Sequence, residues 1–144
     1  MKIDVKKVTE EAILPRDATP ESAGADLYAL PGTDVTLQSG QTALIRTGIA
    51  MAIPAGYAGF VYARSGLATR QGLAPANKVG VIDADYRGEI LVSLFNQSGE
   101  DRTVQGGDRI AQLVIAPVLQ GDFFPVQTLK ETERGTGGFG STGK

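Results

Sequence analysis

The segment EILVSLFN, residues 89–96, is the strongest strand signal in the chain. In an extended backbone Ile90, Val92 and Leu94 point to one face, and the side chains between them point to the other. Both faces carry large apolar side chains, which is typical of a strand that is covered on both sides. The segment therefore predicts a central strand of a sheet.

Glycine and proline interrupt the rest of the chain and leave little room for long helices. The 144 residues include 19 glycines and 7 prolines. Between them lie further short runs with the alternation of strands. These runs are Lys2–Val5, Asp34–Leu37, Thr42–Thr47, Tyr57–Ala63 and Arg109–Val118. Many short strands separated by turns predict an all-β fold, either an antiparallel sandwich or a barrel.

One short helix is expected at Ser65–Arg70, where the sequence is SGLATR. Ser65 is placed to cap the helix by accepting a hydrogen bond from the amide of Leu67 or Ala68. The following glycine, Gly72, is suited to end the helix.

The composition restricts the classes of function. Lysine and arginine number 14 against 16 acidic residues, so no global charge recruits nucleic acid or an anionic membrane. Cysteine and histidine are absent, so acid–base chemistry falls to carboxylates and a bound metal would be oxygen-liganded, preferably Mg²⁺. The charged start MKIDVKKVTEE is unlike a signal peptide, and no apolar run has membrane length. We expect a cytoplasmic, single-domain protein.

Two stretches in the first half of the chain combine a charged side chain with neighbouring glycine. Asp26 lies in AGADLYA and, taken alone, indicates a cap or a surface charge. Arg64 lies in ARSGLA, directly before the expected helix, so its guanidinium, the Ser65 hydroxyl and the helix amides could converge on an anion. The alternative is an arginine that pairs with a surface carboxylate.

The stretch NKVGVIDADYRGEI, residues 77–90, indicates a β-hairpin. In an extended segment Asp83 and Asp85 share one face, and either of them could serve as a general base. Tyr86 offers a flat face for a sugar or a base. The alternative is a turn that is merely rich in aspartate.

Two further stretches lie near the end of the chain. In GDRIAQL, residues 107–113, Gln112 points from a strand toward a polar partner, most simply a neighbouring backbone. The tail RGTGGFGSTGK, residues 134–144, has the G-x-x-x-x-G-K frame of a phosphate loop, but no residue follows Lys144 to form the required helix. Its single aromatic residue, Phe139, and its cationic and hydroxyl side chains instead indicate a lid for a base and its phosphates.

Taken together and in this order, the five stretches resemble the motifs of the trimeric deoxyuridine triphosphatase (dUTPase) family, from Lys2 to Lys144. The resemblance implies a β-jelly-roll and a homotrimer whose active sites are shared between subunits. The first, second and fourth stretches would come from one subunit, the third from another and the tail from the third. The chain would comprise a β-domain, residues 1–133, and a flexible glycine-rich lid, residues 134–144, that acts in trans. Eleven extended residues span up to about 36 Å, enough to reach a neighbour.

The resemblance also implies Mg²⁺-dependent hydrolysis of dUTP to dUMP and pyrophosphate, which keeps uracil out of DNA and supplies dUMP for thymidylate synthesis. Asp83 would be the catalytic base, and Asp26 would hold Mg²⁺ through water. Tyr86 would lie against the deoxyribose, and Phe139 would stack on uracil. The other expected substrate-binding residues are Arg64, Ser65, Gly66, Asn77, Gly80, Val81, Ile82, Gln112, Arg134, Gly140, Ser141 and Thr142.

Two rival functions remain compatible with the same pattern. A dCTP deaminase shares the fold and a similar RS…ID pattern, but Ser93 stands where those enzymes have a catalytic glutamate. A non-catalytic nucleotide-binding protein could use the same scaffold, although all residues of catalytic type are present here.

Overall fold

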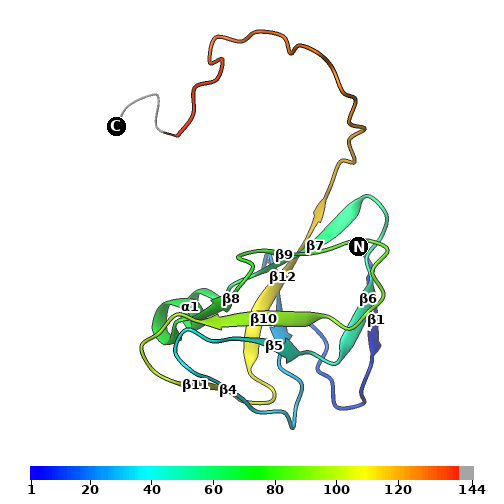
Figure 1. The fold of residues 1–144 in the computed structure, drawn as a ribbon. Coiled ribbons are helices and arrows are strands. Elements are labelled where there is room, and N and C mark those ends of the chain that lie inside the picture. Colours follow the sequence, from blue (N-terminus) through cyan, green and yellow to red (C-terminus); the bar gives the residue numbers. More distant parts are fainter. Residues whose placement is uncertain (140–144) are drawn as a thin grey trace.

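The computed structural model describes residues 1–139, and nearly all of its regular structure is β-strand. Within these residues the single helix is α1 (Ser65–Gln71), and no helix is long and apolar enough to span a bilayer. Figure 1 shows the strands packed into one body from which the C-terminal segment projects. The predicted all-β fold with one short helix is confirmed.

The strands form two larger sheets and two strand pairs, and every pairing is antiparallel. The five-stranded sheet has the order β2 (Arg16–Asp17), β3 (Ala25–Tyr28), β12 (Arg109–Pro117), β7 (Tyr57–Tyr62) and β9 (Gly80–Ile82). The three-stranded sheet has the order β5 (Thr42–Arg46), β10 (Leu91–Asn96) and β8 (Leu73–Pro75). The pairs are β1 (Asp4–Lys7) with β6 (Ile49–Ala52), and β4 (Val35–Leu37) with β11 (Arg102–Val104).

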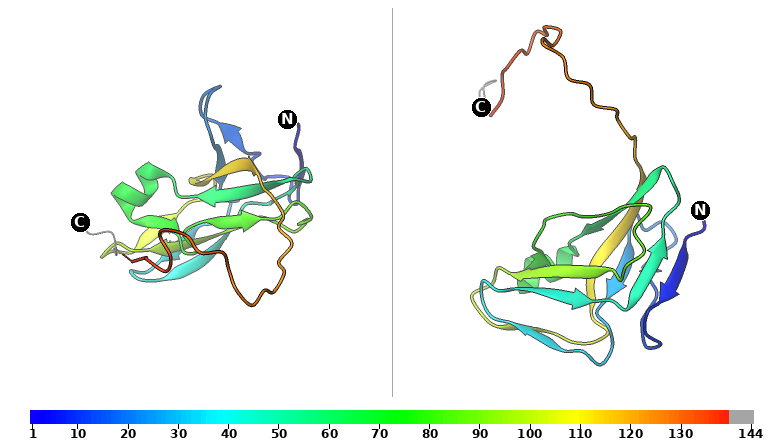
Figure 2. Two further views of the ribbon diagram at one scale, coloured as in Figure 1. Left: turned by 90° about the horizontal axis from the view of Figure 1, so that it is seen from above. Right: turned by 45° about the vertical axis from the view of Figure 1, so that its right-hand side comes forward.

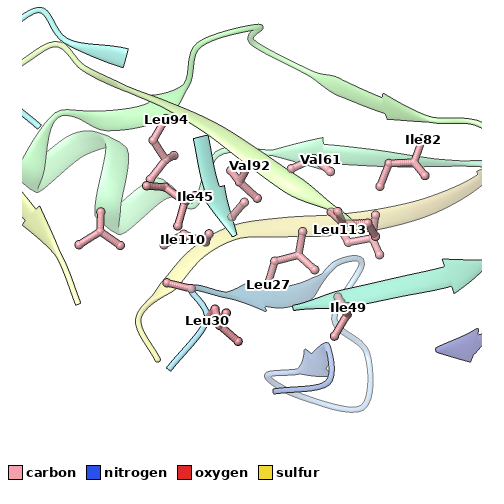
Figure 3. Packing of buried hydrophobic residues seen from close by; sticks show 14 of the residues in the cluster. Leu27, Leu30, Ile45, Ile49, Val61, Ile82, Val92, Leu94, Ile110 and Leu113 are labelled. Carbon is pink, nitrogen blue, oxygen red and sulfur yellow. The ribbon is translucent and has the colours of Figure 1, made fainter. Parts of the chain in front are cut away.

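The hydrophobic core lies between the two larger sheets, as Figure 3 shows. Each buried leucine or isoleucine in such a core stabilises the fold by about 1.5–3 kcal/mol. The five-stranded sheet contributes Leu27, Ile110 and Leu113, and the three-stranded sheet contributes Ile45, Val92 and Leu94.

Strand β10 is the centre of its sheet, as predicted, with β5 on one side and β8 on the other. Its inward residues Val92 and Leu94 are fully buried. The prediction that both faces are covered is wrong for this chain, because Leu91 on the outward face is 44% exposed. The outward face instead lines a cavity that is described below.

Several elements differ from their predictions for local reasons. Five strands of two to four residues, β2, β3, β6, β8 and β11, were not predicted, because alternation is hard to recognise over so short a run, whereas β9 lies within the segment predicted as a hairpin. Helix α1 is capped by Arg64 without a side-chain bond, so the prediction that Ser65 is the cap is wrong. Gly72 ends the helix as expected, with φ of 70° in the left-handed region.

A tight corner between β5 and β6 joins separate parts of the fold. Gly48 has φ of 71°, and its carbonyl accepts a hydrogen bond of 2.7 Å from the Val8 amide. A Cβ atom at position 48 would lie 2.7 Å from Leu30 Cδ1 and 2.9 Å from Ala12 Cβ. Glycine is therefore required here both by backbone conformation and by packing.

The chain beyond β12 leaves the body of the fold, and its described part, residues 118–139, contains neither strand nor helix (Figure 2). Phe123, Phe124 and Leu129 on this segment are almost fully exposed. The predicted domain boundary at residue 133 and the flexibility of the lid stay predictions.

We expect Gly48→Ala to lower the free energy of unfolding by about 2–5 kcal/mol, because left-handed strain adds to overpacking at the corner. The matched control is Gly40→Ala. Gly40 also has a positive φ, 76°, but no described atom lies within 4 Å of the position that the added methyl group would take. The control should lose only the strain contribution of about 1–2 kcal/mol. Urea denaturation of the two variants measures the difference, and equal losses would contradict the packing constraint.

Candidate active site

The expected ligand-binding residues divide between two cavities on the body of the protein. Asp26, Arg64, Ser65, Gly66 and Gln112 line the first cavity, of about 260 Å³. The first, second and fourth stretches of the sequence analysis are thus brought together, as expected. We call this cavity the cationic cavity.

The register of the five-stranded sheet creates the cationic cavity. Gln112 on β12 lies opposite Asp26 on β3 and opposite Tyr62 on β7. Directly opposed residues of antiparallel strands point to the same face of the sheet. Because β7 ends at Tyr62, the chain then carries Arg64 across this face to the start of α1.

Asp26 is the charged centre of this cavity and is 93% buried, with an exposed fraction of 7%. Its Oδ1 accepts a hydrogen bond from Arg64 Nε at 2.7 Å, and its Oδ2 lies 3.4 Å from Arg109 Nη1. Arg64 therefore pairs with a carboxylate, but the alternative that this carboxylate lies on the surface is wrong, because Asp26 is buried. Convergence of Arg64, Ser65 and the helix amides on an anion stays a prediction. One carboxylate faces two guanidinium groups, so positive charge remains for an anionic ligand.

Gln112 bonds to a neighbouring backbone, as predicted, and also borders the cationic cavity. Its Nε2 donates a hydrogen bond of 2.8 Å to the Ala63 carbonyl, and its side chain also lines the cavity. A Cβ atom at Gly24 would lie 3.1 Å from Gln112 Oε1, so glycine leaves room for the amide. The Ala63 contact fixes the chain directly before Arg64.

The second cavity, of about 230 Å³, gathers the expected residues of the third stretch. We call it the hairpin cavity, after the prediction for this segment. Its lining includes Asn77, Gly80, Val81, Ile82, Asp83 and Tyr86, together with Leu91 and Ser93 from the outward face of β10.

The predicted hairpin itself is wrong. Strand β8 pairs with β10, whereas β9 pairs with β7, so the chain leaves the three-stranded sheet after β8, adds β9 to the five-stranded sheet and returns to the three-stranded sheet at β10. The cavity forms along this path. Within it β9 is an edge strand, since β7 is its only neighbour in the described sheet.

Asp83 and Asp85 do not share a face, because a turn follows β9. The Tyr86 amide donates a hydrogen bond of 3.1 Å to the Asp83 carbonyl, which closes this turn. Asp83 and Asp85 both line a neighbouring hollow with Tyr57 and Leu119, but of the two only Asp83 also lines the hairpin cavity. The structure therefore separates two carboxylates that the sequence pattern left equivalent.

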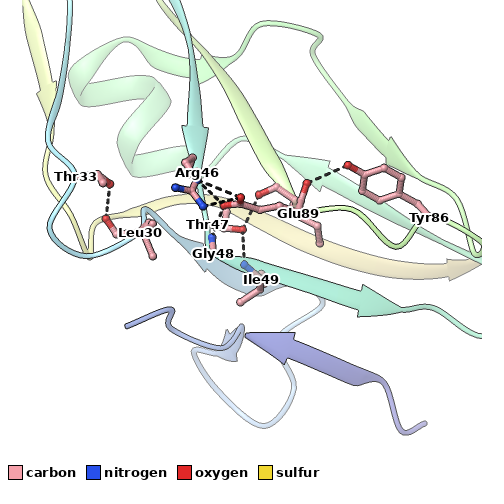
Figure 4. Close-up of polar contacts among 9 residues, drawn as sticks. Leu30, Thr33, Arg46, Thr47, Gly48, Ile49, Tyr86 and Glu89 are labelled. Atoms are coloured by element: carbon pink, nitrogen blue, oxygen red, sulfur yellow. Dashed lines mark hydrogen bonds and ion pairs between the residues drawn. The ribbon is translucent and has the colours of Figure 1, made fainter. Parts of the chain in front are cut away.

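Sequence reasoning missed an ionic cluster beside the hairpin cavity, shown in Figure 4. The Glu89 carboxylate accepts bonds from Arg46 Nη2 at 2.9 Å and from the Gly48 amide at 2.8 Å. Burial alone would raise the pKa of Glu89, but the bonds from Arg46 and Gly48 outweigh it and hold the pKa of Glu89 below its usual range. The same contact raises the pKa of Arg46. The charges are far apart in sequence, so no local motif reveals them.

Arg134 and Phe139, the two expected tail residues that the structure describes, line neither cavity of their own chain. Arg134 Nε donates to the Gly137 carbonyl at 2.9 Å, and Phe139 is fully exposed. The expected ligands Gly140, Ser141 and Thr142 lie outside the described residues.

Comparison with known proteins gives the same result by sequence and by structure. The sequence model of the family described as dUTPase matches residues 10–143. A deoxyuridine 5′-triphosphate nucleotidohydrolase of Desulfitobacterium hafniense is 56% identical over 131 residues, covering 90% of this chain and 87% of that protein. The corresponding protein of Nautilia profundicola is 48% identical over the full length of both chains.

Among solved structures, a Staphylococcus bacteriophage 80alpha dUTPase G164S mutant with dUpNHpp superposes with a TM-score of 0.90 at 27% identity. The match covers 99% of each chain. The chain therefore belongs to the dUTPase family, and the resemblance inferred from the five stretches is confirmed.

The low pKa of Glu89 predicts a specific pH dependence of stability. The stabilisation is complete above the unfolded pKa of about 4.3 and is lost as the pH falls through the lower folded pKa. Glu89→Gln should therefore cost about 1–3 kcal/mol at neutral pH, and the difference from wild type should shrink below about pH 4. Urea denaturation across this pH range measures it.

Glu100→Gln is the control for this measurement. Glu100 is largely exposed and faces Arg102 at 3.4 Å, so its removal should cost less than about 1 kcal/mol at any pH. A Glu89→Gln loss that stayed constant down to pH 3 would contradict the ionic origin of the stabilisation.

Proposed function

We propose that the protein hydrolyses dUTP to dUMP and pyrophosphate in the presence of Mg²⁺, as a cytoplasmic homotrimer with shared active sites. The observation that carries the proposal is the division of the expected residues into a cationic cavity and a hairpin cavity, in a chain of the dUTPase family. The activity would remove a precursor of uracil in DNA and would supply dUMP for thymidylate synthesis.

The hairpin cavity suits the uracil base. An edge strand has backbone groups that are not used by a second neighbour, and β9 brings Gly80, Val81 and Ile82 to this cavity. Uracil has an N3–H donor and an O4 acceptor, whereas cytosine has the reverse pattern. A fixed backbone edge with Asn77 would leave cytosine with unmatched polar groups, which gives strong discrimination. The close cavity wall would also exclude the methyl group of thymine.

The cationic cavity suits the triphosphate. Arg64 is already oriented by Asp26, and Gln112 is oriented by the Ala63 carbonyl, so these donors require little rearrangement when an anion binds. Donors that are held in place before binding stabilise the charge that develops on the leaving pyrophosphate. Ser65 and Gly66 at the start of α1 add a hydroxyl group and backbone amides.

Asp83 is the proposed general base. It would accept a proton from the water that attacks the α-phosphorus, and its position in the hairpin cavity distinguishes it from Asp85. The rival deaminase reaction is disfavoured, because Ser93, which stands in place of the required glutamate, lines this cavity and cannot act as a carboxylate base.

The residues present fit a magnesium ion that arrives with the nucleotide. Among residues 1–139 no three acidic side chains gather into a metal site, and one buried carboxylate, Asp26, borders the cationic cavity. Asp26 would hold water molecules of the ion. The bound ion would neutralise phosphate charge and favour departure of pyrophosphate.

Two observations support sharing of the site between subunits. Among the described residues, no side chain lines both the cationic and the hairpin cavity. The tail that carries Arg134 and Phe139 projects away from its own body (Figure 2). A nucleotide bound by Arg64, Asp83 and Phe139 together would therefore use groups from different copies, with Arg134, Ser141 and Thr142 reaching the terminal phosphate.

The proposed reaction predicts that purified protein with Mg²⁺ releases pyrophosphate from dUTP far faster than from dCTP, dTTP or UTP. Asp83→Asn should lower kcat by about 10²–10⁴-fold, because the general base is lost. Asp85→Asn is the matched control and should retain activity. Equal rates on dTTP would contradict uracil recognition, and an active Asp83→Asn variant would place the base elsewhere.

The shared site predicts complementation between inactive subunits. Asp83→Asn and Arg64→Ala subunits, carrying different tags, are co-expressed and purified through both tags. A hybrid trimer then contains some sites with intact Asp83 and intact Arg64, so activity should reappear at roughly one third of the wild-type level or less, as chance assembly allows. Hybrids that stay as inactive as the two parents would contradict a site built from different subunits.

A further inference from the structure

The ring of Tyr86 lies directly against the backbone of Gly88. A Cβ atom at position 88 would lie 2.6 Å from Tyr86 Cζ and nearer still to Oη. Any residue with a Cβ atom at position 88 would therefore displace the ring, and only glycine leaves room for it. The rest of the side chain faces the hairpin cavity and solvent, with an exposed fraction of 46%.

The hydroxyl group of Tyr86 is also fixed. It donates a hydrogen bond of 3.1 Å to the backbone carbonyl of Glu89, as Figure 4 shows. Gly88 thus leaves the space that the tyrosine ring occupies, and the Glu89 carbonyl oxygen accepts the bond from the tyrosine hydroxyl group. We call these two residues the tyrosine seat.

The tyrosine seat is held from the opposite side by the β5–β6 corner. Arg46 and the Gly48 amide bind the carboxylate of Glu89. The amide of the next residue, Ile90, donates a hydrogen bond of 2.8 Å to the Ile49 carbonyl. The Ile90 carbonyl accepts a hydrogen bond of 2.6 Å from the buried Thr47 hydroxyl group. The Glu89 carbonyl lies between these attachments, so it cannot shift without breaking them.

A wall that rejects a single hydroxyl group must be held to within about 0.5 Å. An exposed tyrosine rotates about two side-chain torsions and would otherwise move away from a ribose 2′-hydroxyl. We propose that Gly88 and Glu89 are positioning residues for Tyr86, and that they set the preference for deoxyribose over ribose. This inference rests on the proposed hydrolysis of dUTP and adds residues to which the resemblance assigned no role.

Gly88→Ala tests the tyrosine seat directly. The added methyl group meets the far end of a side chain that can turn toward solvent, so the variant should fold while the ring is displaced. The ratio of kcat/KM for dUTP to kcat/KM for UTP should fall by about 10-fold or more, mainly through a lower KM for UTP. An unchanged ratio in a folded Gly88→Ala variant would overturn the inference.

Matched variants separate positioning from stability. Gly99→Ala adds a methyl group with no described atom within 4 Å and should keep the wild-type ratio. Tyr86→Phe keeps the ring but loses the bond to Glu89, and Glu89→Gln weakens the support of that bond, so each should lower the ratio in part. Because both act on one contact, the double variant should lose less than the product of the two single effects.

Further readouts distinguish the possible failures. Val104→Ala in β11 destabilises the core away from Tyr86 and should leave the ratio of kcat/KM for dUTP to that for UTP unchanged. A lower ratio in this variant would mean that Glu89→Gln changes the ratio only by destabilising the fold. If the wild-type protein hydrolysed dUTP and UTP equally, the positioning role of Gly88 and Glu89 would be wrong, but the proposed hydrolysis of dUTP would stand. A wild type that hydrolyses neither would overturn the proposed function and the inference with it.

Discussion

The contact that joins separate sheets of the fold is that of the Glu89 carboxylate with Arg46 and the Gly48 amide. Arg46 ends β5 in the three-stranded sheet, and Gly48 precedes β6, which pairs with β1. The Arg46 carbonyl also accepts the Leu30 amide at 2.8 Å, just beyond β3 of the five-stranded sheet. The Glu89 side chain thus joins β5 to the start of β6, and the Arg46 backbone extends this connection to the end of β3. The low pKa of Glu89 is the electrostatic consequence of its contacts with Arg46 and Gly48.

The two cavities arise from the same simple rules of sheet structure. The cationic cavity follows from register, since Gln112 has Asp26 on one side and the end of β7 on the other. The hairpin cavity follows from the path of the chain from the three-stranded sheet to the five-stranded sheet and back, which leaves β9 as an edge strand. Polar chemistry therefore collects where strands end or lack a neighbour, while the interior between the sheets stays apolar.

Sequence alone accounts for much of this architecture. The alternation in residues 89–96 correctly predicted a central strand, and Gly72 correctly ended the short helix. The hairpin was wrong because local alternation does not say which strand is the partner, and β8 and β9 pair with strands of different sheets. Residues 46 and 89 are far apart in the chain, so their contact could not be predicted. The expected site residues came from motif order, which chose Asp83, whereas strand alternation alone left Asp83 and Asp85 equivalent and the structure gives them different surroundings.

The C-terminal segment has a consequence for how the protein behaves in dilute solution. The apolar side chains of the C-terminal segment are exposed to water, which is unfavourable for a single chain in solution. They are Phe123, Phe124 and Leu129. A second copy that covered these side chains would be favoured by mass action, and the apparent melting temperature would then rise with protein concentration. At low concentration the uncovered stretch becomes an accessible site for proteases and for self-association.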